Sequence, residues 1–279
     1  MKKIEKSAWN GRRRAVFSLS GALAILLFVL IGGAWSGDEA ITTSLDEVNL
    51  SPSFSHLFGT DWLGRDMLAR TLQGLTLSIG VGLLGSISSV IIAVALGLMS
   101  AVMGKAVDAC ISWLIDLFLS VPHLVMLILI SFVSGGGLKG VIIGMALTHW
   151  PSLARVIRAE VLQLTTSDYV LASRRLGRSR MWIATRHLGP HVLPQLLVGL
   201  LLLFPHAVLH EASLTFLGLG LSPHQPAIGI ILSESMRYLS TGMWWLAVFP
   251  GLGLLLAVRA FDILGSRLQQ LIDPKHARE

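Results

Sequence analysis

Six apolar runs in this chain are each long enough to cross a lipid bilayer. They lie near residues 15–35, 75–103, 109–134, 138–158, 192–217 and 243–265. A helix needs about 20 predominantly apolar residues to span a hydrocarbon core of about 30 Å. Of the 279 residues, 53% are hydrophobic and 14% are charged, which is far from the balance of a water-soluble domain. The sequence therefore predicts an all-α fold, a polytopic transmembrane bundle of about six helices.

The charges beside these runs predict the orientation of the chain. Six basic residues precede the first run, and more follow at Lys105, between Arg155 and Arg186, and at Arg267, Lys275 and Arg278. With six crossings all of these fall on one side, which the positive-inside rule assigns to the cytoplasm. Both termini are therefore expected in the cytoplasm. The first run is longer than most signal-peptide cores and lacks a good A-x-A site, so we expect it to remain as a helix.

The expected organisation has three parts. Residues 1–74 hold a cytoplasmic tail, the first transmembrane helix and an extracytoplasmic segment, and residues 75–266 hold five helices and a cytoplasmic helix at about 168–187. Residues 267–279 form a cytoplasmic tail. The basic residues lie beside membrane spans without interleaved aromatic residues, so we expect no nucleic-acid partner. The single cysteine, Cys110, excludes an intrachain disulfide and a cysteine-rich metal site.

A polar, arginine-rich segment joins the fourth and fifth runs. It reads Tyr169-Val-Leu-Ala-Ser-Arg-Arg-Leu-Gly177 and continues through basic residues to His187-Leu-Gly-Pro190. Gly177 is suited to end a short helix and Pro190 to open the next one. Small residues such as Ala172 let another surface come close. Membrane topology alone explains the sign of the arginines but not this spacing, so we predict a cytoplasmic docking helix.

A second motif, Phe58-Gly-Thr-Asp-Trp-Leu-Gly-Arg-Asp66, lies in the extracytoplasmic segment. Glycines suit turns there, and the aspartates can accept from backbone N–H groups or pair with arginine. We favour a polar cap that holds the first helix to the bundle, with contact to a substrate or delivery protein as the alternative. The candidate residues are Gly59, Thr60, Asp61, Gly64, Arg65 and Asp66.

Several polar residues and prolines fall inside the apolar runs. Asp116 is expected to form a salt bridge or cap near the interface, and Pro122 to kink its helix because a backbone donor is lost. His206 and His210 share a helix face beside Glu211, a spacing that permits a metal ion but is not the H-E-x-x-H arrangement. Histidines in helices more often bond to neighbouring helices, so no metal is assigned.

No motif for catalysis is present in the chain. Neither G-x-x-x-x-G-K-[ST] nor G-x-S-x-G occurs. An intramembrane enzyme using His206, His210 and Glu211 is a distant alternative. Glycine-rich helices, prolines within spans and a basic cytoplasmic helix favour a transporter, so we expect no enzymatic activity.

The arginine-rich segment resembles the coupling loop of binding-protein-dependent ABC importer permeases. That loop has the pattern E-A-A, three residues, Gly, nine residues, I-x-L-P. Leu171-Ala-Ser173 stands at the E-A-A place, Gly177 at the glycine and His187-Leu-Gly-Pro190 at the end, without the first Glu and the final Leu. The 58–66 motif, Trp150-Pro-Ser-Leu-Ala-Arg155 and Glu211-Ala-Ser-Leu-Thr-Phe-Leu-Gly-Leu-Gly220 extend the resemblance to the second permease of the dipeptide, oligopeptide and nickel group.

The resemblance implies a membrane subunit of a bacterial cytoplasmic (inner) membrane importer. Its partners would be a homologous permease in a heterodimer, two ATP-binding subunits and an extracytoplasmic substrate-binding protein. ATP and Mg would be bound by the partners, with no cofactor on this chain. The residues implied in coupling are Tyr169, Leu171, Ala172, Ser173, Arg174, Arg175, Gly177 and Pro190.

The substrate implied is nickel or a metal–chelator complex, with dipeptide or oligopeptide uptake as the alternative. The histidines and the sequence Leu-Ala-Ser-Arg at 171–174 resemble the nickel permeases of this group. The sequences Glu211-Ala-Ser and Trp150-Pro-Ser fit peptide permeases equally well. Candidate residues of the substrate pathway are His149, His206, His210 and Glu211.

Overall fold

A computed structural model describes residues 2–272, with the side chains of all but residues 2–15, 38, 39, 195 and 270–272. Within that range the chain is helical and has no strand, only an isolated bridge between Thr60 and Asp66. This confirms the predicted all-α fold. Lys275 and Arg278, part of the orientation argument, lie outside the described residues.

The α-helices are, in chain order, α1 (Lys2–Trp35), α2 (Met67–Val102), α3 (Lys105–Ser120), α4 (His123–Val133), α5 (Gly137–Thr148), α6 (Trp150–Leu164), α7 (Asp168–Arg175), α8 (Arg180–Ile183), α9 (Gly189–Phe216), α10 (Ile228–Ser235) and α11 (Trp245–Ile272). Short 3₁₀ helices are η1 (Gly37–Ala40), η2 (Leu45–Glu47) and η4 (Leu239–Thr241), and η3 (Ala184–Leu188) is a π-helical turn.

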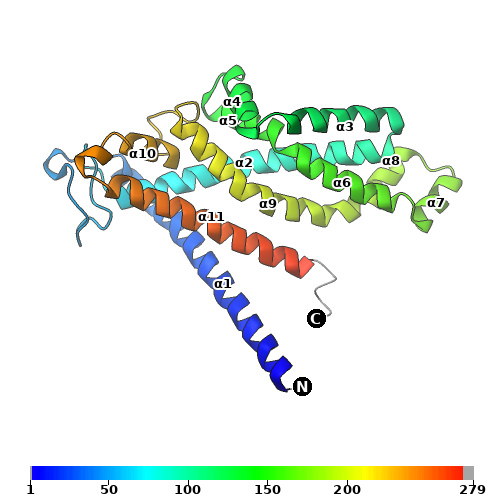
Figure 1. Ribbon diagram of the computed structural model, residues 1–279, viewed down its shortest axis with the longest axis horizontal. Helices are drawn as coiled ribbons and strands as arrows, with labels where there is room; N and C mark the ends of the chain where they lie inside the picture. The colour runs from blue at the N-terminus through cyan, green and yellow to red at the C-terminus, as the bar shows by residue number, and fades with distance from the viewer. Residues whose placement is uncertain (1, 273–279) are drawn as a thin grey trace. The chain divides into compact units, whose positions relative to one another are not determined.

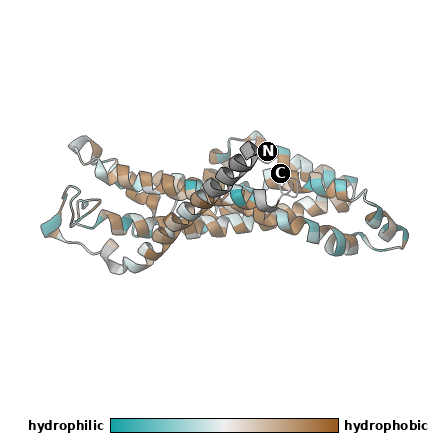
Figure 2. Cartoon of the chain, turned by 90° about the horizontal axis from the view of Figure 1, so that it is seen from below, coloured by the Kyte–Doolittle hydropathy of each residue, from teal (hydrophilic) through white to brown (hydrophobic). Residues whose placement is uncertain are grey.

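Five helical segments are long and apolar enough to cross a membrane. They are Val16–Trp35, Met67–Val102, Gly137–Leu164, Leu196–Phe216 and Trp245–Gln269. The pair α3 and α4 makes a sixth if it is counted as one span. Figure 2 shows apolar residues along most of each helix and hydrophilic residues gathered in several connecting segments.

The expected third crossing, 109–134, is broken in the middle. α3 ends at Ser120 and α4 begins at His123, with a bend of 101° between them. Val121 is extended, with φ −97° and ψ 139°, because the ring of Pro122 disfavours helical geometry in the residue before it. The predicted proline kink is therefore a full break that turns the chain.

α2 begins at Met67, eight residues before the expected start at 75. The Asp66 carboxylate accepts from the backbone N–H groups of Leu68 at 2.8 Å and Ala69 at 2.9 Å, so it caps the helix. With 36 residues, α2 is about 54 Å long and exceeds a hydrocarbon core of about 30 Å. Hydropathy could not show this start, because the first turns of α2 carry polar residues.

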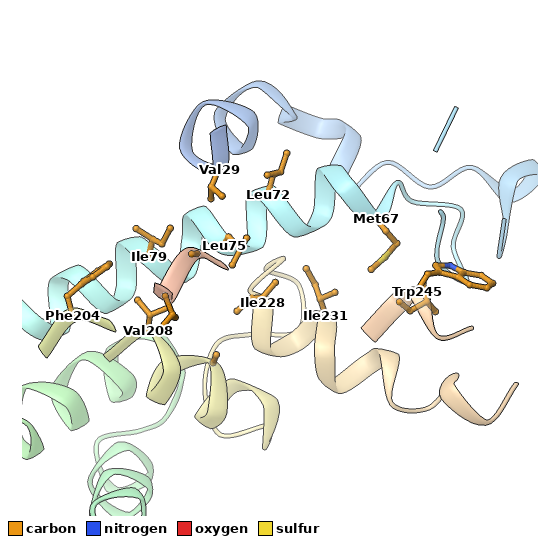
Figure 3. Close-up of a cluster of buried hydrophobic side chains, with 14 residues drawn as sticks. Val29, Met67, Leu72, Leu75, Ile79, Phe204, Val208, Ile228, Ile231 and Trp245 are labelled. Carbon is orange, nitrogen blue, oxygen red and sulfur yellow. The ribbon is translucent and has the colours of Figure 1, made fainter. Parts of the chain in front are cut away.

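The helices form two compact units. Unit 1 consists of residues up to Gly82 and from Phe204 onward, and unit 2 of Leu83–Leu203, so the chain passes between them within α2 and within α9. The core of unit 1 gathers apolar side chains from α1, α2, α9, α10 and α11. Figure 3 shows ten of them labelled: Val29, Met67, Leu72, Leu75, Ile79, Phe204, Val208, Ile228, Ile231 and Trp245.

The core of unit 2 joins the second half of α2 to α3, α6, α7, α8 and the start of α9. Ile111, Ile157 and Ile183 are buried together there. Gly97 lets α6 approach α2, because a Cβ at this position would lie 2.8 Å from the Ile157 side chain. The salt bridge expected for Asp116 is present, with 2.6 Å between its carboxylate and Nη2 of Arg155 on α6.

Candidate functional site

The residues that resemble a coupling loop lie in unit 2. We call residues 168–190 the coupling segment. α7 and α8 lie together at one end of unit 2 (Figure 1). The segment begins with α7, whose first turn contains Asp168 and whose last turn contains Arg174 and Arg175. These charges complement the helix dipole at each end.

Gly177 ends α7, as predicted. Its φ of 76° is left-handed, a conformation that favours glycine. The N–H of Gly177 donates to the carbonyl of Arg174 at 3.0 Å, and the N–H of Arg178 donates to that of Ser173 at 3.1 Å. This pair of bonds is a complete Schellman motif. The expected helix at 168–187 is therefore two helices, α7 and α8, followed by the π-helical turn η3.

Pro190 does not open a separate helix. Helical backbone already starts at Arg180, where the Ser179 hydroxyl accepts from the N–H of Trp182 at 3.2 Å, and it continues through η3 into α9. Within η3 the N–H of Gly189 bonds to the carbonyl of Ala184, five residues before it. Pro190, which has no N–H to donate, follows directly after this π-helical turn, where the regular i→i−4 bonding is already interrupted.

Three apolar side chains attach the coupling segment to the core of unit 2. Val170, Ile183 and Leu188 are fully or almost fully buried in the core of unit 2. Burying such a side chain stabilises a structure by about 1.5–3 kcal/mol. These three residues attach the segment firmly to α6 and to the neighbouring turns.

His187 joins α7 to η3. Its Nε2 lies 2.8 Å from the Ser173 hydroxyl, and its ring packs edge-on against Tyr169 and Trp182 at centroid distances of 5.4 and 5.1 Å. Arg178 lies over the Trp182 ring at 4.8 Å, a cation–π contact. Sequence reasoning named Ser173 and Tyr169 but missed Trp182 and the positioning role of His187, which depend on a contact across 14 residues.

Several side chains on the outer face of the segment are exposed. Leu176 is 81% exposed, Leu171 is 40% exposed and Tyr169 is 41% exposed. Ala172, Arg174 and Arg175 are exposed beside them. The segment thus presents apolar and basic side chains at its surface, above a buried apolar core.

The motif at residues 58–66 lies in unit 1 and is built around Asp61. This carboxylate is fully buried and accepts from the N–H groups of Leu63 and Arg65, from Nε of Arg65 at 2.7 Å and from Nη1 of Arg70 at 2.6 Å. Nη2 of Arg70 donates to Glu234 on α10 at 3.0 Å. Sequence reasoning missed Glu234, which is distant in sequence.

Two turns in this region require glycine. We call residues 44–66 the cap loop. Gly59 and Gly64 have φ of 71° and 72°, and a Cβ on Gly64 would lie 1.7 Å from the carbonyl oxygen of Ser44. The Thr60 hydroxyl accepts from the N–H of Leu50 at 2.8 Å. Trp62 stacks on Tyr238 at 4.7 Å. These contacts fix the backbone of the cap loop and join it to Tyr238.

His56 pairs with the remaining aspartate of the motif. Its Nδ1 lies 3.0 Å from Oδ2 of Asp66. The hydrogen bond to Asp66 raises the pKa of His56 against the opposing effect of burial, and the charges of Asp66 and Glu47 raise it further. Asp66 therefore both caps α2 and holds the cap loop.

The candidate pathway residues are divided between the two units. In unit 2, His149 is buried between α5 and α6, its Nδ1 lies 3.1 Å from the Met145 carbonyl oxygen, and its ring meets that of His123 edge-on at 4.4 Å. In unit 1, His206 is exposed and His210 is half-buried on α9.

Glu211 differs from these two histidines in burial. It is fully buried in unit 1, and its Oε1 accepts from the Thr215 hydroxyl at 2.8 Å. α10 packs closely beside it, since a Cβ on Gly229 would lie 2.4 Å from the Ala212 carbonyl oxygen. His206 and His210 thus share a face of α9 at i and i+4, while Glu211 is buried against α10.

Known proteins resemble the chain in sequence. A family model described as "Binding-protein-dependent transport system inner membrane component" matches residues 93–278. The dipeptide transport system permease protein DppC of Bacillus subtilis (strain 168) is 33% identical over 98% of this chain and 86% of its own length. The oligopeptide permease OppC of the same organism is 33% identical over 96% of this chain and 87% of its own length.

A solved structure resembles the chain in fold. A chain of the MetNI methionine ABC transporter in an inward-facing conformation matches with a TM-score of 0.58 and 19% identity, over 74% of this chain and 98% of that one. The extent of the family match and the identity to DppC decide the assignment. The chain is a multi-pass ABC importer permease, not an enzyme, and belongs to the family of binding-protein-dependent transport system inner membrane components.

Proposed function

We propose that this permease couples to ATP-binding subunits through the exposed face of α7. The observation that carries the proposal is the contrast within the coupling segment. Leu176 and the arginines are exposed, whereas Val170 beneath them is fully buried. A push on the exposed face is passed to α6 and α9 through packed side chains, as rigid-body motion of helices requires.

The proposed assembly contains a homologous permease, two ATP-binding subunits and an extracytoplasmic binding protein. DppC and OppC are named as transport system permeases, and MetNI is an ABC transporter. In this assembly ATP and Mg are bound by the partners, and this chain carries no cofactor. Both termini and the coupling segment face the cytoplasm, as the distribution of basic residues indicates.

The proposed substrates are short peptides. DppC and OppC are permeases of dipeptide and oligopeptide systems, which supports the peptide alternative better than nickel, the substrate favoured by the histidines. His206 and His210 remain candidate pathway residues on α9. We assign Glu211 a packing role, because it is fully buried against α10.

The substrate proposal is tested with the complete transporter in proteoliposomes. ATP-dependent uptake of a labelled dipeptide, a labelled tetrapeptide and ⁶³Ni²⁺ is measured with the binding protein present. We expect peptide uptake and no competition by excess Ni²⁺. Nickel uptake that needs no peptide would contradict the proposal.

The coupling proposal is tested by placing a charge on α7. Leu171→Asp should abolish peptide-stimulated ATP hydrolysis and reduce the amount of ATP-binding subunits that co-purify. The control is Leu45→Asp, also on an exposed leucine, at 75% exposure in unit 1. Equal co-purification from both variants would show that α7 is not the docking surface.

A further inference from the structure

A cavity of about 420 Å³ lies in unit 2 beside the coupling segment. Its walls include Leu98, Met99 and Met103 at the end of α2, together with Arg180, Met181 and Gly189. Its volume falls within the range of about 300–1,000 Å³ that is usual for small-molecule sites. Neither the residues of α7 nor the candidate pathway residues line this cavity.

The cavity depends on the backbone of η3 and on Gly189. A π-helical turn is wider than an α-helical one and is often found at functional sites. A Cβ on Gly189 would meet only the Ala184 carbonyl oxygen among described atoms, at 3.2 Å, so the space beyond it is open. Gly189 stands where the pattern that this segment resembles has leucine. The departure from the pattern leaves space that a leucine side chain would occupy.

The cavity combines apolar walls with a cation at its edge. Methionine side chains provide an adaptable apolar lining. Nη1 of the exposed Arg180 donates to the Met103 carbonyl oxygen at 2.9 Å, which holds the guanidinium group at the turn between α2 and α3. A guanidinium group has five N–H donors, so others can bind a phosphate. Lys105 is exposed in the same turn.

Asp108, in the first turn of α3, is already paired. Its carboxylate is bonded to Arg158, with 2.6 Å between Oδ2 and Nη2, and to the Ser100 hydroxyl. The edge therefore carries net positive charge. A small soluble anion would not use the apolar walls, and a neutral apolar ligand would not use Arg180. A ligand with an anionic head and an apolar tail uses both.

We propose that this cavity binds an anionic phospholipid. It lies at the end of α2, a membrane-spanning helix, so a lipid of the adjacent leaflet can reach it. The phosphate binds Arg180, and an acyl chain lies between α2 and η3. Basic pockets between transmembrane helices are known to bind lipid head groups. A bound lipid would contact both α2 and the coupling segment and hold them together, regardless of which solute is transported.

The test uses the complete transporter, purified and stripped of lipid, then exposed to vesicles of phosphatidylcholine with or without phosphatidylglycerol. Native mass spectrometry counts the lipids retained. We expect selective retention of phosphatidylglycerol. Arg180→Gln should reduce its apparent affinity about tenfold, as expected for the loss of a charge-assisted hydrogen bond. Arg186→Gln removes an exposed charge outside the cavity and should have no effect.

A second series tests the cavity itself. Gly189→Ala should weaken lipid retention slightly and Gly189→Leu strongly, because the side chain fills the space. If Gly189→Leu prevents assembly, the alanine variant and Arg180→Gln still decide. Unchanged retention in both, or equal loss in Arg186→Gln, would overturn the proposal. So would cross-linking of a Met181→Cys variant to the second permease through the cavity, because a protein would then fill it.

Discussion

The cap loop and the coupling segment both carry a recognisable motif, but they use their polar residues in opposite ways. In the cap loop, Asp61 is fully buried and all its contacts lie within unit 1. In the coupling segment, Arg174 and Arg175 are exposed over a buried Val170. The first motif holds its own unit together, and the second presents a surface. Substitutions should therefore affect stability in one and coupling in the other.

The largest expected effect on stability is that of Asp61→Ala. It would leave Arg70, whose side chain is 3% exposed, without its closest partner. Removing one member of a buried ion pair destabilises a protein by about 3–5 kcal/mol. Thermal unfolding of the detergent-solubilised transporter measures the loss. The matched control is Asp116→Ala, whose carboxylate is 70% exposed, and it should cost at most about 1 kcal/mol. Equal losses would show that Asp61 is not buried in a network.

The next prediction compares the loss of stability when alanine replaces glycine at two turns, Gly64 and Gly177. Gly64→Ala places a Cβ 1.7 Å from a backbone oxygen, whereas at Gly177 no described atom lies within 4 Å of the Cβ position. Both residues have positive φ, which costs about 1–2 kcal/mol for alanine. Gly64→Ala should therefore unfold the protein at a clearly lower temperature than Gly177→Ala. The reverse order would contradict the described turns.

Leu176→Asp should lower function without lowering stability. Leu176 is 81% exposed, and surface substitutions usually change stability by no more than about 0.5 kcal/mol. We expect peptide-stimulated ATP hydrolysis to fall at least about tenfold, the equivalent of 1.4 kcal/mol. Unfolding temperature and ATPase rate are measured on the same preparation. A large fall in unfolding temperature would place Leu176 in the core rather than on a docking surface.

The smallest effect is a pH dependence confined to the cap loop. Asp66 raises the pKa of His56, so folding favours protonated histidine. This stabilisation is complete below the unfolded pKa, about 6.5, and is lost as pH rises through the folded value. Raising the pH from about 6 to about 8 should therefore lower the unfolding temperature less in His56→Gln than in the unchanged protein. Identical pH profiles would show that the pair with Asp66 contributes nothing.

Local backbone chemistry could be predicted from the sequence. Gly177 ends α7 and Pro122 interrupts the third crossing because each acts on bonds within a few residues. Apolar length predicted about six membrane crossings, and the described residues contain five suitable helical segments, or six if α3 and α4 are counted as one span. The helical start at Arg180 was missed, because Pro190 was given the role of opening a helix that had already begun.

Contacts between distant residues could not be predicted in this way. Arg70 meets Glu234 across 164 residues, and His187 meets Ser173 across 14. In a membrane protein the lipid-facing and protein-facing sides of a helix are both apolar, so periodicity does not reveal which side is buried. In the sequence Glu211 stands beside two histidines. In the structure α10 packs closely beside it, and Glu211 is buried in the core of unit 1.

The sequence by itself determined that this protein is a helical membrane permease, because apolar length and motif spacing are properties of the chain alone. Only the tertiary structure decided that the charged residues of the cap loop form internal ion pairs, whereas the arginines of the coupling segment stay exposed. Burial depends on which helices pack against a residue, and that is set by the whole fold rather than by neighbouring residues.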